Sequence, residues 1–225
     1  MKLMHPLFST PICFKENSIQ VLTIENPVMF REVLFELIAQ TESKEGRFVL
    51  SVKDQVLDCA DHMNVIMDYA HLSAIDKKLQ NKLLMKLIKD TQETMAEDTF
   101  HLIGQLQQYM GKLAAMVDYP VTYEQSENLT ALLKAMEFRA DLDDLPPHEM
   151  LFEYLDLNQQ ITKDQCFALV HAKAFFSVDE LQQLYSMAHY KKWNLLLIES
   201  HIAGVRLESE QYRLYDMDLC ELADS

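Results

Sequence analysis

The alternation of hydrophobic and polar residues predicts a strand–helix–strand unit near the carboxyl end of the chain. Residues 167–172 form a short apolar run. Ser177 stands at the expected N-cap of a helix, and Glu180, three residues later, completes a capping box. The apolar face of that helix repeats at helical spacing, with Leu181, Leu184, Tyr185 and Ala188. The wholly apolar segment 193–198 is typical of a strand buried on both faces, so the unit is predicted to be a right-handed βαβ crossover in a parallel sheet.

The pattern in the first third of the chain also predicts α/β structure, with elements in the order β, α, β, β. Residues 19–24 have the pattern of a strand that Asn26-Pro27 ends. Polar residues 41–46 predict a turn, and two short strands are expected at 48–52 and around 65–67. The helix before that turn has one apolar face, formed by Val28, Met29, Val33, Leu34, Leu37 and Ile38.

The pattern changes to purely helical at about residue 73. No proline occurs from there to residue 117, so one very long helix or two packed helices are expected. A helix of about 35 residues would extend for about 50 Å, which favours a protruding arm. Two apolar stripes recur at helical spacing and fit either arrangement: Ile75, Leu79, Leu83 and Leu87 form the first, and Leu102, Ile103, Leu106, Met110, Leu113 and Val117 form the second. Pro120 ends this region, and Asn128 is the expected cap of a further helix over 129–138.

After a predicted surface turn at 141–147, the chain returns to α/β character. A helix at 149–157 precedes the βαβ unit, and a strand is expected near 212–214. The acidic end should be solvated, with Asp216, Asp218, Glu221 and Asp224. The predicted fold class is therefore α/β, with a discontinuous head from residues 1–72 and 138–225 and an inserted helical domain at 73–137.

Composition predicts a cytoplasmic protein. No apolar run approaches the roughly 18 residues of a membrane span. The amino-terminal residues have neither a long apolar stretch nor a small-residue cleavage site, so no secretory signal is expected. The four cysteines are scattered without C-x-x-C spacing, which favours reduced thiols over disulfides or zinc. The net charge of −15 argues against a nucleic-acid binder, although screening within about 10 Å lets a local basic surface act independently.

Motifs for catalysis are absent. With four glycines in all, the chain has no phosphate-binding G-x-x-x-x-G-K-[ST] loop, and it has no G-x-S-x-G or H-E-x-x-H. His171 follows a predicted core strand and is interpreted as a packed or half-exposed histidine. Asp68 is interpreted as a strand-end carboxylate, since a metal ligand there would need a phosphate loop to serve. We therefore expect no enzymatic activity.

Basic residues offer two candidate nucleic-acid contacts. Lys78, Lys82, Lys86 and Lys89 fall on one face of the long helix, where they would form either a solvated face or a ridge that follows phosphates. Lys44, Arg47 and Lys53 form a second group around a turn and a strand.

Carboxylates at the break between helices offer one candidate metal site. Asp118, Glu124 and Glu127 lie in an irregular segment, and Ca²⁺ prefers six to eight oxygen ligands. The alternative is a polar loop whose acids cap the helices.

Four stretches of the chain resemble one known family in content and order. They are SIQVLTIENPVMFREVLFEL, FVLSVKDQVLDCADHMNVIMDY, NLTALLKAMEFRAD and FFSVDELQQLYSMAHYKKWNLLLIES. Together they resemble the spacer-acquisition protein of type II-A CRISPR loci, which takes part in antiviral defence. The likeness covers nearly the full chain and rests on pattern rather than on a short signature.

The resemblance implies properties that the residues alone do not. Such proteins have an α/β head like a degenerate P-loop ATPase, with a helical leg. They form homotetrameric rings stabilised by Ca²⁺, here with Asp118, Glu124 and Glu127 as candidate ligands. Linear double-stranded DNA threads the hole by its ends, without sequence preference, and no catalysis is known. Further partners are the CRISPR integrase proteins and the RNA-guided effector nuclease.

Three functions follow as alternatives. The first is a non-enzymatic ring that binds DNA ends, with Lys44, Arg47, Lys53, Lys78, Lys82 and Lys86 as the candidate contacts. The second is an acidic protein–protein scaffold of the adaptation complex that does not touch DNA, which the net charge favours. The third is an atypical nucleotide hydrolase, against which the missing glycines argue.

Overall fold

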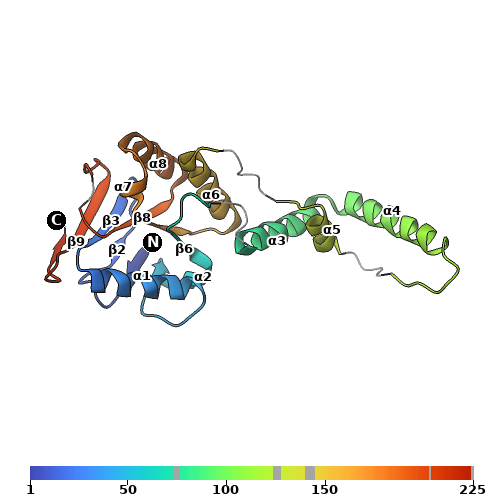
Figure 1. Cartoon of the computed structure of the whole chain (residues 1–225), viewed down its shortest axis with the longest axis horizontal. Coiled ribbons are helices and arrows are strands. Elements are labelled where there is room, and N and C mark those ends of the chain that lie inside the picture. The colour runs from blue at the N-terminus through green and yellow to red at the C-terminus, as the bar shows by residue number, and fades with distance from the viewer. Residues whose placement is uncertain (73–76, 124–127, 140–144, 203, 224–225) are drawn as a thin grey trace. The chain divides into compact units, whose positions relative to one another are not determined.

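The protein consists of two compact units (Figure 1). The structure is a computed structural model, and it describes residues 1–72, 77–123, 128–139, 145–202 and 204–223. One unit comprises residues 1–72 and 142–225, and the other comprises residues 73–141. The chain contains both helices and two sheets, so the predicted mixed α/β class is confirmed.

A six-stranded sheet forms the centre of the first unit, in the order β10-β9-β3-β8-β7-β6. Five strands run parallel, and β10 pairs with β9 in the antiparallel direction. The strands are β3 (Ile19–Ile24), β6 (Met63–Ile66), β7 (Cys166–Val170), β8 (Asn194–Glu199), β9 (Glu210–Tyr215) and β10 (Glu221–Ala223). Every residue of β7 is buried, as expected for a strand covered on both faces.

Helices cover both faces of this sheet (Figure 1). Helix α1 (Pro27–Thr41), with the short α2 (Cys59–His62), lies on one face, and α6 (Pro147–Ile161) and α8 (Val178–Lys191) lie on the other. A four-residue helix α7 (Ala172–Phe175) follows β7. Alternate residues of β8 serve the two faces, since Leu196 and Ile198 join the core cluster that contains the buried side chains of α1.

Most of the predicted βαβ unit is confirmed in detail. Ser177 caps α8 and forms the capping box with Glu180. The four predicted core residues of α8 are all buried: Leu181, Leu184, Tyr185 and Ala188. Lys192 ends the helix in the left-handed conformation, with φ of 58°.

A second, antiparallel sheet has the order β2-β1-β4-β5. Its strands are β1 (Lys2–Met4), β2 (Ile12–Cys13), β4 (Val49–Val52) and β5 (Gln55–Leu57). Three of these strands, β1, β2 and β5, and the helix α2 were not predicted, because segments of two to four residues are too short to show a period. One further expectation is wrong. Glu221 is half-buried in β10, where it accepts hydrogen bonds from the Tyr215 hydroxyl and the Ser9 N–H. On the predicted apolar face of α1, Met29, Val33, Leu34 and Leu37 are buried, whereas Val28 in the first turn is 59% exposed.

The helical unit contains α3 (Lys77–Thr94), α4 (Ala96–Ala114) and α5 (Leu129–Ala135). Of the two alternatives for this region, two helices is correct, since Met95 separates α3 from α4. The Asn128 side chain accepts a hydrogen bond from the Ala131 N–H and caps α5, as predicted. Leu79 and Leu84 of α3 are buried, and α5 packs against α3. The predicted turn at 141–147 lies partly outside the described residues, as do Ile75 and Asp224.

Candidate functional site

The start of α1 lies at the carboxyl edge of the parallel sheet, where α/β proteins commonly hold phosphate groups. Only Glu25 and Asn26 connect β3 to α1. The Asn26 side-chain oxygen accepts hydrogen bonds from the N–H groups of Val28 at 3.0 Å and Met29 at 3.1 Å. Pro27 has no N–H to offer. The amides that could hold a phosphate are therefore already bonded within the helix itself.

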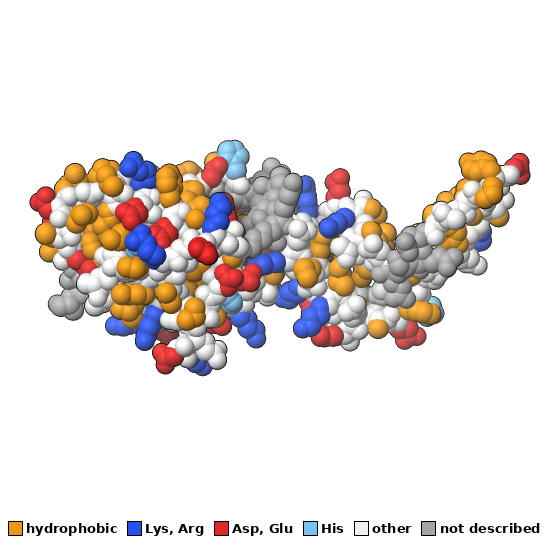
Figure 2. All heavy atoms as spheres, turned by 90° about the horizontal axis from the view of Figure 1, so that it is seen from below, with side chains coloured by type: hydrophobic (Ala, Val, Ile, Leu, Met, Phe, Trp, Pro, Cys, Tyr) orange, Lys and Arg blue, Asp and Glu red, His pale blue; other side chains and the backbone are white. Residues whose placement is uncertain are grey.

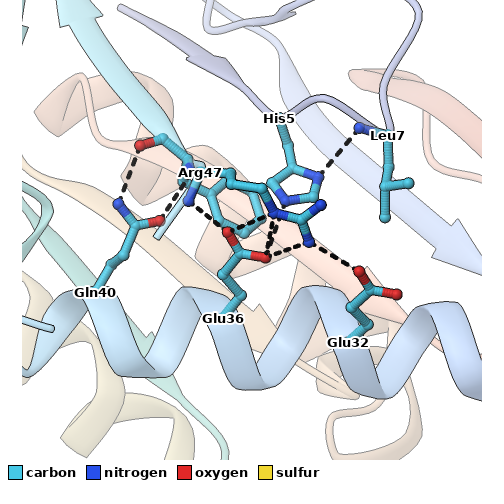
Figure 3. A network of polar contacts seen from close by, with 7 residues as sticks. His5, Leu7, Glu32, Glu36, Gln40 and Arg47 are labelled. Carbon is cyan, nitrogen blue, oxygen red and sulfur yellow. Dashed lines mark hydrogen bonds and ion pairs between the residues drawn. The ribbon is translucent and has the colours of Figure 1, made fainter. Parts of the chain in front are cut away.

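Arg47 binds two carboxylates of α1 (Figure 3). Its guanidinium donates to Glu36 through Nε at 3.1 Å and Nη2 at 2.7 Å, and Nη2 also donates to Glu32 at 2.8 Å. The Arg47 backbone N–H bonds to Glu36 as well. These hydrogen bonds, chiefly that of the guanidinium, lower the pKa of Glu36 to about 2. Arg47 thus ties the segment before β4 to α1, and two carboxylates offset its charge.

His5 completes this network beneath Arg47 (Figure 3). Its side chain is fully buried, and its Nδ1 accepts a hydrogen bond from the Leu7 N–H at 3.3 Å. The proton therefore resides on Nε2, which donates to Glu36 at 3.2 Å. Gln40 forms two hydrogen bonds with the backbone of Phe48, whose ring lies 4.4 Å from that of His5. No local pattern points to this network, because its members come from three separate segments.

The other predicted basic residues divide between the two units. Lys44 forms an ion pair with Glu42 at 2.7 Å, and both side chains are exposed. Lys53 is exposed at a positive φ of 47° in the turn between β4 and β5. Lys82 and Lys86 lie one turn apart on α3 and are half-buried. The side chain of Lys78 lies outside the described residues.

Asp118 is the described member of the predicted calcium site. It is exposed in the segment after α4, and Glu124 and Glu127 lie outside the described residues. Within the described part of the chain, no three His, Cys, Asp or Glu residues are grouped as metal ligands would be. Because two of the three predicted ligands lie outside the described residues, calcium binding at this segment stays a prediction.

A buried ionic cluster spans the helix α7, the strand β9 and the helix α8. The Lys173 ammonium lies 2.7 Å from Glu210, and their side chains are 3% and 0% exposed. Glu210 also accepts hydrogen bonds from the Tyr185 hydroxyl at 2.6 Å and from the Leu207 N–H at 2.9 Å. Burial, and secondarily the hydrogen bond to Glu210, raises the pKa of Tyr185.

Glu199 extends the cluster to the end of β8. One of its oxygens accepts a hydrogen bond from the Lys173 N–H at 3.0 Å, and burial raises the pKa of its carboxyl. His171 lies 3.7 Å from Glu199 and stacks on Phe30, with its side chain 42% exposed. The interpretation of His171 as a half-exposed histidine is confirmed. Because the cluster connects elements that are distant in sequence, its geometry supports a structural role, holding α7, α8, β8 and β9 together.

The family model of the CRISPR-associated protein (Cas_Csn2) matches residues 40–219, which is 180 of the 225 residues. The match includes α3, α4 and α5 of the helical unit and four of the five parallel strands. This chain belongs to the Cas_Csn2 family. The resemblance noted in the sequence is thereby confirmed, and the protein has a role related to CRISPR adaptation.

Two further findings concern the chain as a whole. No curated protein matches its sequence. Among the described residues, no helix is long and apolar enough to span a membrane.

Proposed function

We propose that this Cas_Csn2 protein binds the ends of linear double-stranded DNA, without sequence preference and without catalysis, as a homotetrameric ring that serves spacer acquisition. Its partners would be the integrase proteins and the RNA-guided effector nuclease of the same locus. The mechanism is topological, since a closed hole admits a DNA end but not a closed circle. Membership of the Cas_Csn2 family supports a role in CRISPR adaptation, to which this proposed activity would contribute.

The geometry at the start of α1 supports the proposal that the protein is not an enzyme. If the head derives from a P-loop ATPase, its phosphate cradle should lie between β3 and α1. That connection is two residues long, and the Asn26 side chain bonds the first free amides of the helix. A nucleotide hydrolase would need those amides and a glycine-rich loop to hold its substrate. This geometry favours DNA binding over hydrolysis.

Phosphate contacts would supply the affinity for DNA. The charge of Arg47 is already offset by Glu32 and Glu36, which weakens Arg47 as a phosphate contact. Lys82 and Lys86 lie on the same helix one turn apart, a spacing of about 6 Å that suits neighbouring phosphates. Lys44 and Lys53 remain candidates at the surface of the first unit, and Lys78 remains a candidate from its place in the sequence.

The double variant K82Q/K86Q is expected to bind DNA more weakly, by the same factor for duplexes of any sequence. The slope of log affinity against log salt should fall by about 0.9 for each phosphate that the variant no longer neutralises. Fluorescence anisotropy of a labelled linear duplex measures this slope, in a salt series from about 50 to about 300 mM that brackets physiological ionic strength. Lys192→Gln is the matched control, since Lys192 pairs with Glu16 on an exposed surface of the other unit. An unchanged slope in the double variant would remove the α3 lysines from the interface.

A protein–protein scaffold without DNA contact is the second candidate function. The net charge of −15 and the exposed apolar face of α4 favour it. Absence of DNA binding by the unaltered protein, together with capture of an integrase protein, would select it. Calcium binding through Asp118, Glu124 and Glu127 stays a separate expectation, which calorimetric titration of the protein with calcium tests directly.

A further inference from the structure

A row of four side chains crosses the large sheet near the carboxyl ends of its parallel strands. Each is paired in register with the next: Glu199 in β8, Thr23 in β3, Leu214 in β9 and Leu222 in β10. Paired residues of neighbouring strands point to the same face of a sheet, so these four side chains lie side by side. Helix α1 packs against the alternate residues of β3 and β8, which places the row on the other face.

Along its length the row changes from polar and buried to apolar and exposed. Glu199 and Thr23 are each 1% exposed, Leu214 is half-buried, and Leu222 is 59% exposed. The Thr23 hydroxyl and one carboxyl oxygen of Glu199 are buried and have no hydrogen-bond partner within the described part of the chain. A buried polar group without a partner costs free energy, which a bound molecule with a hydrogen-bonding group recovers. The inner end of the row is therefore suited to a polar group of a ligand.

A cavity of about 310 Å³ lies over this row. Its lining includes Thr23, Leu214 and Leu222, together with Tyr212 of β9 and Ile202 from the segment after β8. Hydrophobic side chains reach the surface of this unit (Figure 2), and Ile202, which is 61% exposed, is one of them. Ligand sites have volumes of about 300–1,000 Å³ and often lie at the carboxyl ends of parallel strands. The cavity therefore suits a small, largely apolar molecule.

Arg206 adds a positive charge to the lining of the cavity. Its guanidinium carbon lies 4.9 Å from the centre of the Tyr212 ring, and one of its nitrogens donates to the Glu210 backbone carbonyl at 3.3 Å. These two contacts hold the guanidinium beside the cavity. A guanidinium stacked on an aromatic ring binds carboxylates through the N–H groups at its edge. Arg206 is therefore positioned to attract an anionic group of the ligand.

The three features together define a class of ligand. The Tyr212 ring and the leucine side chains favour a flat apolar body. Arg206 favours a carboxylate at one end of that body. The inner end favours a neutral hydrogen-bonding group over a second charge, because Glu199 is buried there and burial raises the pKa of its carboxyl. A hydroxyl group meets this requirement, since it both donates and accepts hydrogen bonds.

We propose that this cavity binds a small hydroxylated aromatic carboxylate, with its hydroxyl at Thr23, its ring against Tyr212 and Leu214, and its carboxylate at Arg206. The inference is independent of the proposed function, because none of these residues is a candidate DNA contact. The whole site lies within the first unit.

Three related fluorescent molecules test the proposal by titration into the full chain. 6-Hydroxy-2-naphthoate has all three parts, 2-naphthoate lacks the hydroxyl, and 2-naphthol lacks the carboxylate. The complete molecule should bind with a dissociation constant of about 0.1–1 mM, the affinity usual for about 14 non-hydrogen atoms. The two incomplete molecules should bind more weakly, 2-naphthoate by about threefold and 2-naphthol by about tenfold.

Two variants identify the contacts by their selectivity among these molecules. Arg206→Gln should weaken binding of both carboxylates about tenfold and leave 2-naphthol unchanged. Thr23→Val should weaken binding of 6-hydroxy-2-naphthoate about threefold and leave 2-naphthoate unchanged, because it removes the hydroxyl contact alone. Since the Thr23 hydroxyl has no partner to lose, Thr23→Val should unfold at the same urea concentration as the native protein or at a higher one.

Arg31→Gln is the matched control. Arg31 is exposed on α1, on the opposite side of the sheet, so its replacement should not change the binding of any of the three molecules. Absence of binding by all three at up to about 5 mM, well above the expected dissociation constant, would overturn the inference. Equal weakening of all three by Arg206→Gln, or by Thr23→Val, would also overturn it, because the loss would then come from altered packing rather than from the proposed contacts.

Discussion

Lys173→Met is expected to lower the free energy of unfolding by about 3–5 kcal/mol, the typical cost of removing one partner of a buried ion pair. Lys173 and Glu210 are almost completely excluded from solvent and lie 2.7 Å apart. The methionine side chain fills similar space but leaves the Glu210 carboxylate without its counter-charge. Urea unfolding at neutral pH, followed by circular dichroism, measures the change.

Lys192→Met is the matched control for this prediction. It breaks the exposed pair between Lys192 and Glu16, and should cost at most about 1 kcal/mol. Adding Glu210→Gln to Lys173→Met should recover part of the loss, because the neutral amide no longer needs a buried counter-charge. Equal costs for the two lysine substitutions would contradict a buried ionic cluster.

Glu36→Gln is expected to destabilise the protein by about 2 kcal/mol at neutral pH, and the difference from the native protein should disappear in acid. Its folded-state pKa of about 2 is below the ordinary 4.5, so the carboxylate contributes stability above pH 4.5 and loses it as the pH falls toward 2. The half-exposed Arg47 makes the effect smaller than the shift alone implies. Unfolding curves of both proteins from pH 7 down to about pH 2, which cover the interval between the two pKa values, give the comparison.

Glu42→Gln provides the comparison at an exposed site. Its pair with Lys44 is open to solvent, so little change is expected at any pH. A constant difference between Glu36→Gln and the native protein down to low pH would mean that Glu36 acts through packing rather than charge.

The central parallel sheet could be predicted from the sequence because its segments are long and strongly patterned. The strand β3 has the predicted bounds, and the capping box of Ser177 and Glu180 marks the start of α8. The strands β1, β2 and β5 could not be predicted, since their stability comes from pairing between distant segments rather than from a local period.

The candidate site shows the same division between local and long-range information. A basic residue at position 47 is visible in the sequence, but its carboxylate partners Glu32 and Glu36 are identified only in the folded chain, where the segment before β4 contacts α1. The helical period of the apolar stripe on α4 is confirmed, while its members differ in burial: Ile103 is buried, and Leu102 and Leu106 are exposed. Periodicity shows that a face is apolar, and cannot show whether that face is covered.

Binding of the purified protein to a linear duplex and to the same DNA as a covalently closed circle tests whether a DNA end is needed. If DNA threads the ring by an end, the protein should bind the linear form, fail to bind the circle, and bind again after one cut. A linear duplex with both ends blocked by a bulky group should behave like the circle. Equal affinity for the linear and circular forms would contradict threading by a DNA end.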